Sequence, residues 1–384
     1  MGDKKLIYLD NSATTRQYDE VTDLIAKISK EEFGNPSSLH SLGLDAEKIV
    51  KRYRKDLIDK TNLKRITFTS GGTEADNMAI FSAARKYRRE NKKYITTVIE
   101  HPAVLEAMKR LEMDGNKVAY IPVDSEGVIN ISALKEEIDK DTAFVSVMTV
   151  NNETGTVQPI NEINKIIKEK APNAIFHTDA VQAFGKMRLE NINADMISIS
   201  GHKFHGPKGI GALYSNEKLN LLPYIVGGGQ ENGLRSGTEN VPGICGISLA
   251  SSMSYRNFDK KMEKLTSLNE YLYNGLMSEV DDIRLNGAEN RLPSVLNVSF
   301  LGTRAEVILH TVEQEAIYVS TGSACSSNKN GDSHVLSAMG LMHKDIEGAI
   351  RFSFSEFNNT SELDIVIDRF AKAVKRYRKL GSYR

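Results

Sequence analysis

The stretch AFVSVMTV at residues 143–150 is nearly all apolar, and it is followed by INEINKII at residues 160–167. A short apolar run bounded by polar residues predicts a strand buried on both faces, as in a parallel sheet. The second stretch carries Ile160, Ile163 and Ile167 at helical spacing, which predicts an amphipathic helix. Together the two stretches predict a buried strand followed by a helix that covers it.

The same alternation continues on both sides of this pair. Further strands are predicted at residues 66–68, 94–99, 118–123, 174–178, 196–199 and 211–214. Helices are predicted at residues 21–28, 102–111 and 132–138, the last beginning at Ser132. This order favours an α/β fold with a mainly parallel sheet covered by helices on both faces, in which ligands bind at the carboxyl ends of the strands.

The pattern changes after about residue 249. A long polar helix that connects two domains is predicted at residues 257–277, and an amphipathic helix at residues 361–378. Strands are predicted between them, at residues 295–300 and 316–319. The second part of the chain is therefore expected to form a smaller α+β unit.

Composition excludes several classes of protein. The chain has 384 residues, enough for about two to three domains at roughly 150 residues each. Lys plus Arg and Asp plus Glu are 50 each, so the balance does not favour a protein built to hold nucleic acid or an anionic membrane surface. Two cysteines exclude a disulfide framework and a zinc site with three or four thiolates. With no signal peptide and no apolar run of membrane-spanning length, we expect a soluble cytoplasmic protein that holds no metal.

The segment SGHKFHGPKG at residues 200–209 directly follows a predicted strand. A lysine at that position can be desolvated, which lowers its pKa and makes its amine a nucleophile able to condense with an aldehyde. Lys203 is the candidate. A solvated surface loop is the alternative, and it is the interpretation we keep for Lys208, which follows a Gly-Pro pair and is predicted to lie in a turn.

The segment FHTDAVQ at residues 176–182 also lies at a strand end. A carboxylate there can pair with a protonated pyridine nitrogen and keep it protonated, which makes a bound pyridoxal ring an electron sink. Asp179 is the candidate, with a helix N-cap as the alternative.

Two glycine-rich segments are candidate phosphate sites. In TSGGTEADN at residues 69–77, the two glycines allow close backbone approach, and Thr73 with the start of a helix presents N–H donors to an anion. In GGGQENGLRSGT at residues 227–238, a cation and a hydroxyl accompany flexible backbone. The alternatives are an ordinary strand–glycine–helix turn for the first and a long mobile loop for the second.

The two cysteines have different surroundings. Cys245 has apolar neighbours and is predicted to be a buried structural residue. Cys325 lies in STGSACSSNKNGD at residues 320–332, a small and polar segment predicted to be an exposed, mobile loop. Such a thiol is reactive when nearby cations lower its pKa. An incidental surface cysteine is the alternative.

Taken together, these segments resemble the cysteine desulfurases of the NifS/IscS type, in the class V aminotransferase group. The resemblance covers nearly the whole chain and also includes YLDNSATT (8–15), GNPSSLH (34–40), IEHPA (99–103), VNNETG (150–155) and RFS (351–353). It implies the pyridoxal-phosphate-dependent transferase fold of type I, with a mainly parallel seven-stranded sheet covered by helices and a smaller α+β domain. The implied large domain is 16–256, and the small domain, carrying the cysteine loop, is 1–15 with 257–384.

The resemblance implies a pyridoxal 5'-phosphate cofactor and catalytic roles for three residues. Lys203 would hold the cofactor covalently and shuttle protons. His101 would stack on the ring and assist proton transfer. Cys325 would accept sulfur.

The resemblance also implies binding roles. Asp179 would pair with the pyridine nitrogen, Gln182 and Asn152 would bind the ring-oxygen side, and Arg351, assisted by Asn35, would bind the substrate carboxylate. The implied phosphate ligands are Gly72, Thr73, Ser200 and His202, with Thr238 reaching the site of the partner subunit in a homodimer.

The implied reaction takes sulfur from L-cysteine and leaves L-alanine and a persulfide on Cys325, for an acceptor protein in iron–sulfur cluster assembly or tRNA thiolation. A selenocysteine lyase, or another class V lyase or aminotransferase, is the alternative and would not need Cys325. A sulfur-carrier or regulatory binding module on an inactive scaffold would lack the lysine, the aspartate or the substrate arginine, yet all three are present. Direct nucleic-acid binding is not expected, because the basic end at residues 372–378 is better explained as a solvated helix end.

Overall fold

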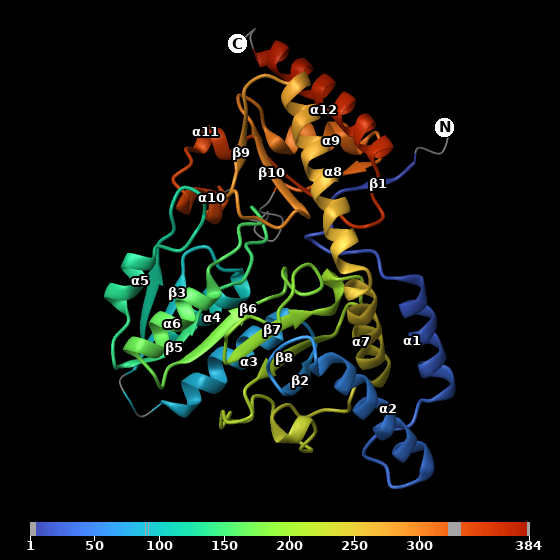
Figure 1. Ribbon diagram of the computed structural model, residues 1–384, viewed down its shortest axis with the longest axis vertical. Coiled ribbons are helices and arrows are strands. Elements are labelled where there is room, and N and C mark those ends of the chain that lie inside the picture. Colours follow the sequence, from blue (N-terminus) through green and yellow to red (C-terminus); the bar gives the residue numbers. More distant parts are fainter. Residues whose placement is uncertain (1–4, 89, 91, 322–331, 382–384) are drawn as a thin grey trace.

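The computed structural model describes residues 5–88, 90, 92–321 and 332–381. Its largest feature is a seven-stranded sheet (Figure 1). The strands are β2 (Arg65–Thr69), β3 (Lys93–Thr97), β4 (Lys117–Ile121), β5 (Thr142–Ser146), β6 (Ile175–Asp179), β7 (Met196–Ser200) and β8 (Gly211–Ser215). They lie in the order β2-β8-β7-β6-β5-β3-β4, and every neighbouring pair is parallel except the two that involve β8. The predicted mainly parallel sheet is confirmed.

Helices cover both faces of this sheet. They are α1 (Asp19–Glu31), α2 (Ser41–Ile58), α3 (Gly72–Lys86), α4 (Pro102–Met113), α5 (Ile131–Glu137), α6 (Ile160–Lys170) and α7 (Val241–Tyr255). Alternate strand residues enter two different cores: Val145 and Ile197 pack with α1, α2, α6 and α7, whereas Phe144 and Met196 pack with α3 and α4. Because both faces are covered, every residue of β5 to β8 is buried, including the polar ones.

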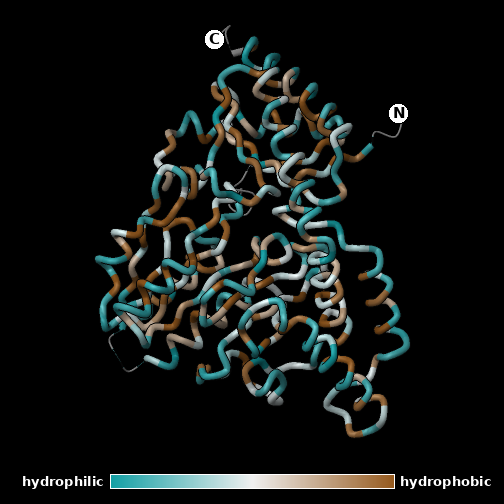
Figure 2. Tube along the Cα trace, in the orientation of Figure 1, coloured by the Kyte–Doolittle hydropathy of each residue, from teal (hydrophilic) through white to brown (hydrophobic). Residues whose placement is uncertain are grey.

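The outer helices expose one face to solvent. Along α1, at the edge of the molecule, hydrophilic and hydrophobic positions alternate (Figure 2), and Val21 and Ile28 are its buried residues. In contrast, α7 is buried on most of its surface because it packs against both α1 and α2. Cys245 lies in α7 and is fully buried, as predicted.

A second, smaller unit lies above the large sheet in Figure 1. It contains an antiparallel sheet of order β12-β10-β9 and a parallel pair β1-β11, formed by β1 (Ile7–Tyr8), β9 (Ile283–Asn286), β10 (Val295–Phe300), β11 (Ile317–Tyr318) and β12 (Ala349–Ser353). Its helices are α8 (Phe258–Glu279), α9 (Ala305–Glu313), α10 (His334–Ala338), α11 (His343–Ile346) and α12 (Thr360–Gly381). The unit has a hydrophobic core of its own, to which α8 contributes Leu265, Leu268, Leu272 and Leu276. The division into 16–256 and 1–15 with 257–384 stays a proposal that these separate cores support.

Several predicted boundaries shift by one or two residues in the structure, and two differences have a visible cause. The helix expected to begin at Ser132 begins at Ile131, and its N-cap is Asn130, whose side chain accepts a hydrogen bond from the N–H of Ala133 (3.0 Å). The strand expected over residues 143–150 ends at Ser146. Beyond Ser146, the N–H of Met148 donates to the Glu100 carboxyl (3.0 Å), while the N–H of Thr149 still donates to the carbonyl oxygen of Asp179 on β6 (2.8 Å).

The small core depends on an aromatic cluster. Phe352 on β12 is fully buried, and its ring centroid lies 5.0 Å from that of Phe370 on α12. We expect Phe352→Ala to lower the free energy of unfolding by about 3–5 kcal/mol, because it removes buried ring contacts and leaves a cavity. Ile365→Ala, at a position 43% exposed on the same helix as Phe370, should change it by less than about 0.5 kcal/mol. Urea unfolding of both variants measures the difference, and equal losses would contradict this account of the core.

Candidate active site

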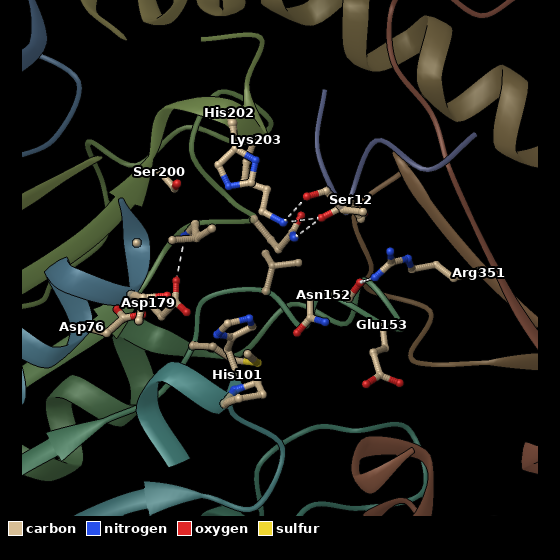
Figure 3. Close-up of a pocket in the computed structure, with 18 of the residues that line it drawn as sticks. Ser12, Asp76, His101, Asn152, Glu153, Asp179, Ser200, His202, Lys203 and Arg351 are labelled. Atoms are coloured by element: carbon tan, nitrogen blue, oxygen red, sulfur yellow. Dashed lines mark hydrogen bonds between the residues drawn. The ribbon is translucent and has the colours of Figure 1, made fainter. Parts of the chain in front are cut away.

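A cavity of about 280 Å³ lies where the carboxyl ends of β6 and β7 meet the small unit. Figure 3 shows Asp179 on one side of it and Arg351 on the other, with Lys203 and His101 at opposite edges between them. The predicted site residues that line the cavity are Gly72, Thr73, His101, Asn152, Asp179, Gln182, Ser200, His202, Lys203 and Arg351.

Lys203 points into this cavity from a 3₁₀ turn, Gly201–Lys203, that directly follows β7. Its Nζ donates hydrogen bonds to the carbonyl oxygens of Ser12 (2.7 Å) and Ala13 (2.8 Å), which are drawn as dashed lines in Figure 3. The amine therefore lies inside the protein, and the solvated-loop alternative does not apply to it.

The turn that carries Lys203 requires glycine at its first position. A Cβ on Gly201 would lie 2.9 Å from the carbonyl oxygen of Pro207, closer than real side chains approach. Lys208, on the same loop, is exposed in a turn, as predicted. The loop thus carries one enclosed lysine and one solvated lysine.

Asp179 is the last residue of β6, and its Oδ1 accepts a hydrogen bond from the N–H of Val181 (2.8 Å). Burial raises the pKa of Asp179 to about 6, although the Val181 N–H and the Lys203 charge act in the opposite direction. No helix begins at this residue, so the N-cap alternative does not apply.

A second carboxyl, on Asp76 of α3, lies beside Asp179 (Figure 3). Its Oδ1 is buried, has no hydrogen-bond partner among the described residues, and lies 3.6 Å from His177 Nε2. Burial and the Asp179 charge raise the pKa of Asp76 well above its usual value, while burial lowers the pKa of His177 to about 3 and keeps that ring neutral. Two buried carboxyls thus face the same end of the cavity.

The N-terminus of α3 forms another part of the wall. Gly72 and Thr73 lie in its first turn, where the backbone N–H groups of a helix attract anions. A Cβ on Gly72 would lie 2.7 Å from Val181 Cγ2, so a side chain would fill this space. Ser200 and His202 line the cavity nearby, and burial followed by the Lys203 charge lowers the pKa of His202 to about 4.

His101 is the N-cap of α4, and its Nδ1 accepts a hydrogen bond from the N–H of Ala103 (3.1 Å). Burial, followed by the charges of Lys203 and His334, lowers the pKa of His101 to about 4. The ring is therefore neutral near pH 7. Since Nδ1 is an acceptor, the ring proton is on Nε2.

Arg351 lies on β12 and is almost fully buried. Its Nη1 donates to the carbonyl oxygen of Asn152 (2.9 Å), and its Nη2 donates to Oδ1 of Asp10 (2.8 Å). Its Nε has no hydrogen-bond partner among the described residues. The guanidinium is thus fixed in place with donor capacity remaining for a carboxylate.

Three predicted site residues are not in this group. Asn35 lies exposed between α1 and α2, and Thr238 lies exposed before α7; neither lines the cavity of its own chain. In the same glycine-rich segment as Thr238, Arg235 pairs with Glu74 (2.8 Å). Cys325 lies outside the described residues.

Five further residues with polar side chains or backbone contacts line the cavity without having been singled out: Ser12, Ala13, Asp76, Glu153 and His334. The first four lie within sequence motifs quoted above, and membership in those motifs is the only sequence feature that could have identified them as site residues. Their contribution depends on contacts between distant parts of the chain, which motifs do not specify.

Comparison with known proteins agrees with this geometry. Residues 7–366 match the family model "Aminotransferase class-V". The chain belongs to the class-V aminotransferase family. It is 41% identical over 384 residues to "Cysteine desulfurase IscS" of Clostridium botulinum, a match that covers 98% of this chain and 96% of that protein.

Two solved structures are also similar. One, "NIFS-LIKE PROTEIN", has a TM-score of 0.91 and 37% identity, with 97% of this chain and 100% of that one covered. Another, "SspA in complex with cysteine", has a TM-score of 0.81 and 33% identity, with 92% and 100% covered. The predicted resemblance to cysteine desulfurases, the enzyme class and the α/β fold of this class-V family member are thereby confirmed.

Neither a membrane-spanning helix nor a metal-binding cluster occurs among the described residues. Among them, no helix is long and apolar enough to cross a membrane. Within the same part of the chain, no group of three or more His, Cys, Asp or Glu side chains is arranged to hold a metal ion.

Glu100, the residue before His101, has a buried carboxyl whose protonation can be tested. Glu100 accepts hydrogen bonds from the Thr97 hydroxyl (2.6 Å) and the Met148 N–H (3.0 Å), and burial raises its pKa from 4.5 to about 8. The folded protein keeps this proton up to about pH 8, whereas the unfolded chain loses it near pH 4.5. The contribution of Glu100 to the free energy of unfolding is therefore complete below its pKa in the unfolded chain. That contribution is lost as the pH rises toward 8.

We expect Glu100→Gln, which has no proton to lose, to become more stable than the wild type as the pH rises. The difference in the free energy of unfolding should grow by up to about 1.4 kcal/mol per pH unit between those two pKa values. Urea unfolding at several pH values measures this slope, with Glu136→Gln, an exposed change on α5, as the control. Parallel pH profiles for Glu100→Gln and wild type would show that Glu100 is ionised.

Proposed function

We propose that this protein is a pyridoxal-phosphate-dependent cysteine desulfurase that converts L-cysteine to L-alanine and passes the sulfur to Cys325. The observation that carries the proposal is the enclosed Lys203 amine, which shares one cavity with the Asp179 carboxyl and the buried Arg351 guanidinium. The relatives named cysteine desulfurase and the related structure titled as a complex with cysteine support the reaction and the substrate.

The residues present fit the cofactor. The start of α3, with space that a Cβ on Gly72 would fill, suits a phosphate. One helical turn further along α3, the buried and unpartnered Oδ1 of Asp76 beside Asp179 suits a protonated ring nitrogen.

The residues that would hold the phosphate are Gly72, Thr73, Ser200 and His202. Asp179 would hold the pyridine nitrogen, Gln182 and Asn152 the ring-oxygen side, and Lys203 the aldehyde carbon. When bound, pyridoxal phosphate supplies an aldehyde that captures an amine and a ring that withdraws electrons from the substrate Cα.

The chain itself would supply binding and proton transfer. Arg351 would bind the substrate carboxylate with donors that Asp10 and Asn152 leave available. Lys203 Nζ, displaced by the substrate amine, would remove the proton from the substrate Cα and return a proton to the substrate. His101 would donate its Nε2 proton, since its Nδ1 is occupied by the Ala103 N–H.

Sulfur transfer would conserve all atoms. The Cys325 thiolate would attack the sulfur of the substrate, the Cβ–S bond would break, and Cβ would gain a proton. The products are L-alanine and a persulfide on Cys325, which an acceptor protein would then receive in iron–sulfur cluster assembly or tRNA thiolation.

We also propose a cytoplasmic homodimer. Thr238 and Asn35 are both exposed and lie outside the cavity of their own chain, as residues that serve a partner's site would be. In that arrangement Thr238 would reach the phosphate in the partner subunit, and Asn35 would assist with substrate.

Reduction of the cofactor-loaded protein tests the lysine assignment. After treatment with pyridoxal phosphate and borohydride, mass spectrometry should find a pyridoxyl group on the peptide that contains Lys203. Lys203→Ala should lose both that adduct and the yellow colour, whereas Lys208→Ala, at the exposed turn, should keep both. An adduct retained in Lys203→Ala would refute the assignment.

Cysteine replacement tests the sulfur step. With L-cysteine and a reductant, Cys325→Ala should form alanine and sulfide at least about 100-fold more slowly than wild type, because it lacks the attacking nucleophile. Cys245→Ala, in the buried core of α7, should retain the wild-type rate. Full alanine formation by Cys325→Ala would instead favour a lyase that needs no acceptor thiol.

A further inference from the structure

Lys186 is a largely enclosed lysine that has no role in the reaction proposed above. It lies directly behind the active site, where it lines a second cavity of about 40 Å³ that Lys203 also borders. Its Nζ donates a hydrogen bond to Oε1 of Gln182 (3.1 Å). Gln182 itself lines the main cavity, so Lys186 is one hydrogen bond removed from the ligand site.

The contacts of Gln182 determine which way its amide points. Gln182 Nε2 donates to the carbonyl oxygen of Ser12 (2.9 Å), an atom that can only accept. A lysine ammonium can only donate, so it requires the amide oxygen on its own side. The amide nitrogen carries two hydrogens and Ser12 takes one, which leaves the second to be offered to the main cavity.

Lys186 also changes the strength of this donor. A hydrogen bond from a cation to the amide oxygen polarises the amide and strengthens the N–H on its other side. An oxygen that carries negative charge gains most from such a donor.

Without a ligand, the surroundings of Lys186 disfavour its charged form. Burial, followed by the charges of Lys203 and Arg351, lowers the pKa of Lys186 to about 7. The other titratable side chains that border its cavity are Tyr18, His205, Lys261 and Glu356, and the last two form an ion pair with each other (2.5 Å). An anionic atom near Gln182 would favour the charged form of Lys186.

We propose that Lys186 is a positioning residue that acts through Gln182, holding its amide as an N–H donor to an ionised oxygen of the bound ligand. This inference rests on the proposed function, in which that oxygen is the ionised ring hydroxyl of pyridoxal phosphate. Lys186 therefore favours the yellow form of the cofactor, with the ring oxygen ionised, over the form with a neutral ring oxygen that absorbs in the near ultraviolet.

The test uses the purified holoenzyme without substrate and compares the two absorption bands. Lys186→Met should lower the ratio of the yellow to the ultraviolet band by about tenfold, the effect of losing one hydrogen bond that involves a charged group. Lys186→Arg keeps a cation and a donor and should keep a ratio within about threefold of wild type. Thermal unfolding of the apoproteins checks that each variant is folded, and Lys186→Gln replaces Lys186→Met if the latter does not fold.

A double-mutant cycle separates this role from a purely structural one. In a Gln182→Leu background, Lys186→Met should change the band ratio by less than about twofold, because the residue through which it acts is gone. A wild-type ratio in Lys186→Met, or the same tenfold effect with and without Gln182, would overturn the inference. If the wild-type protein forms no yellow species with pyridoxal phosphate, the proposed function itself fails, and this inference fails with it.

Discussion

The site depends on the position of the Lys203 amine between two backbone carbonyl oxygens, those of Ser12 and Ala13. These residues belong to the N-terminal segment, and the N–H of Ser12 also donates to the Ser353 hydroxyl on β12 (2.8 Å). One short segment therefore joins the turn after β7 of the large sheet to the small sheet. Because Arg351 lies on the same strand as Ser353, this connection brings the amine and the guanidinium to one cavity.

Burial gives two parts of the cavity wall complementary properties. In one part, Asp179 and Asp76 have raised pKa values because the charged form of each is poorly solvated there. In the other part, His202 is kept neutral, and the N-terminus of α3 provides N–H donors. A ligand with a cationic ring nitrogen and an anionic phosphate would compensate both parts at once, which is the electrostatic reason for the proposed cofactor.

Much of the fold follows from the local sequence pattern. Where the observed elements differ from the predicted ones, the cause is an individual contact that the pattern does not reveal. The apolar run at 143–150 predicts a strand correctly, but the strand ends at Ser146, and the Met148 N–H donates to the Glu100 carboxyl. At the site, Lys203 and Asp179 could be predicted because Asp179 ends a buried strand and Lys203 lies in the turn after another. Asp76 could not, since a carboxylate in the first two turns of a helix is usually solvated, and only the packing of α3 against the sheet encloses it.

The sequence by itself determined the alternating order of strands and helices, the separate C-terminal unit and the reactive side chains at strand ends. These features depend on interactions between residues close along the chain. Only the tertiary structure decided that Ser12 contacts Lys203 across 191 residues and that Asp10 holds Arg351 across 341. Contacts of this kind form when separate elements pack and exclude water, so no local pattern specifies them.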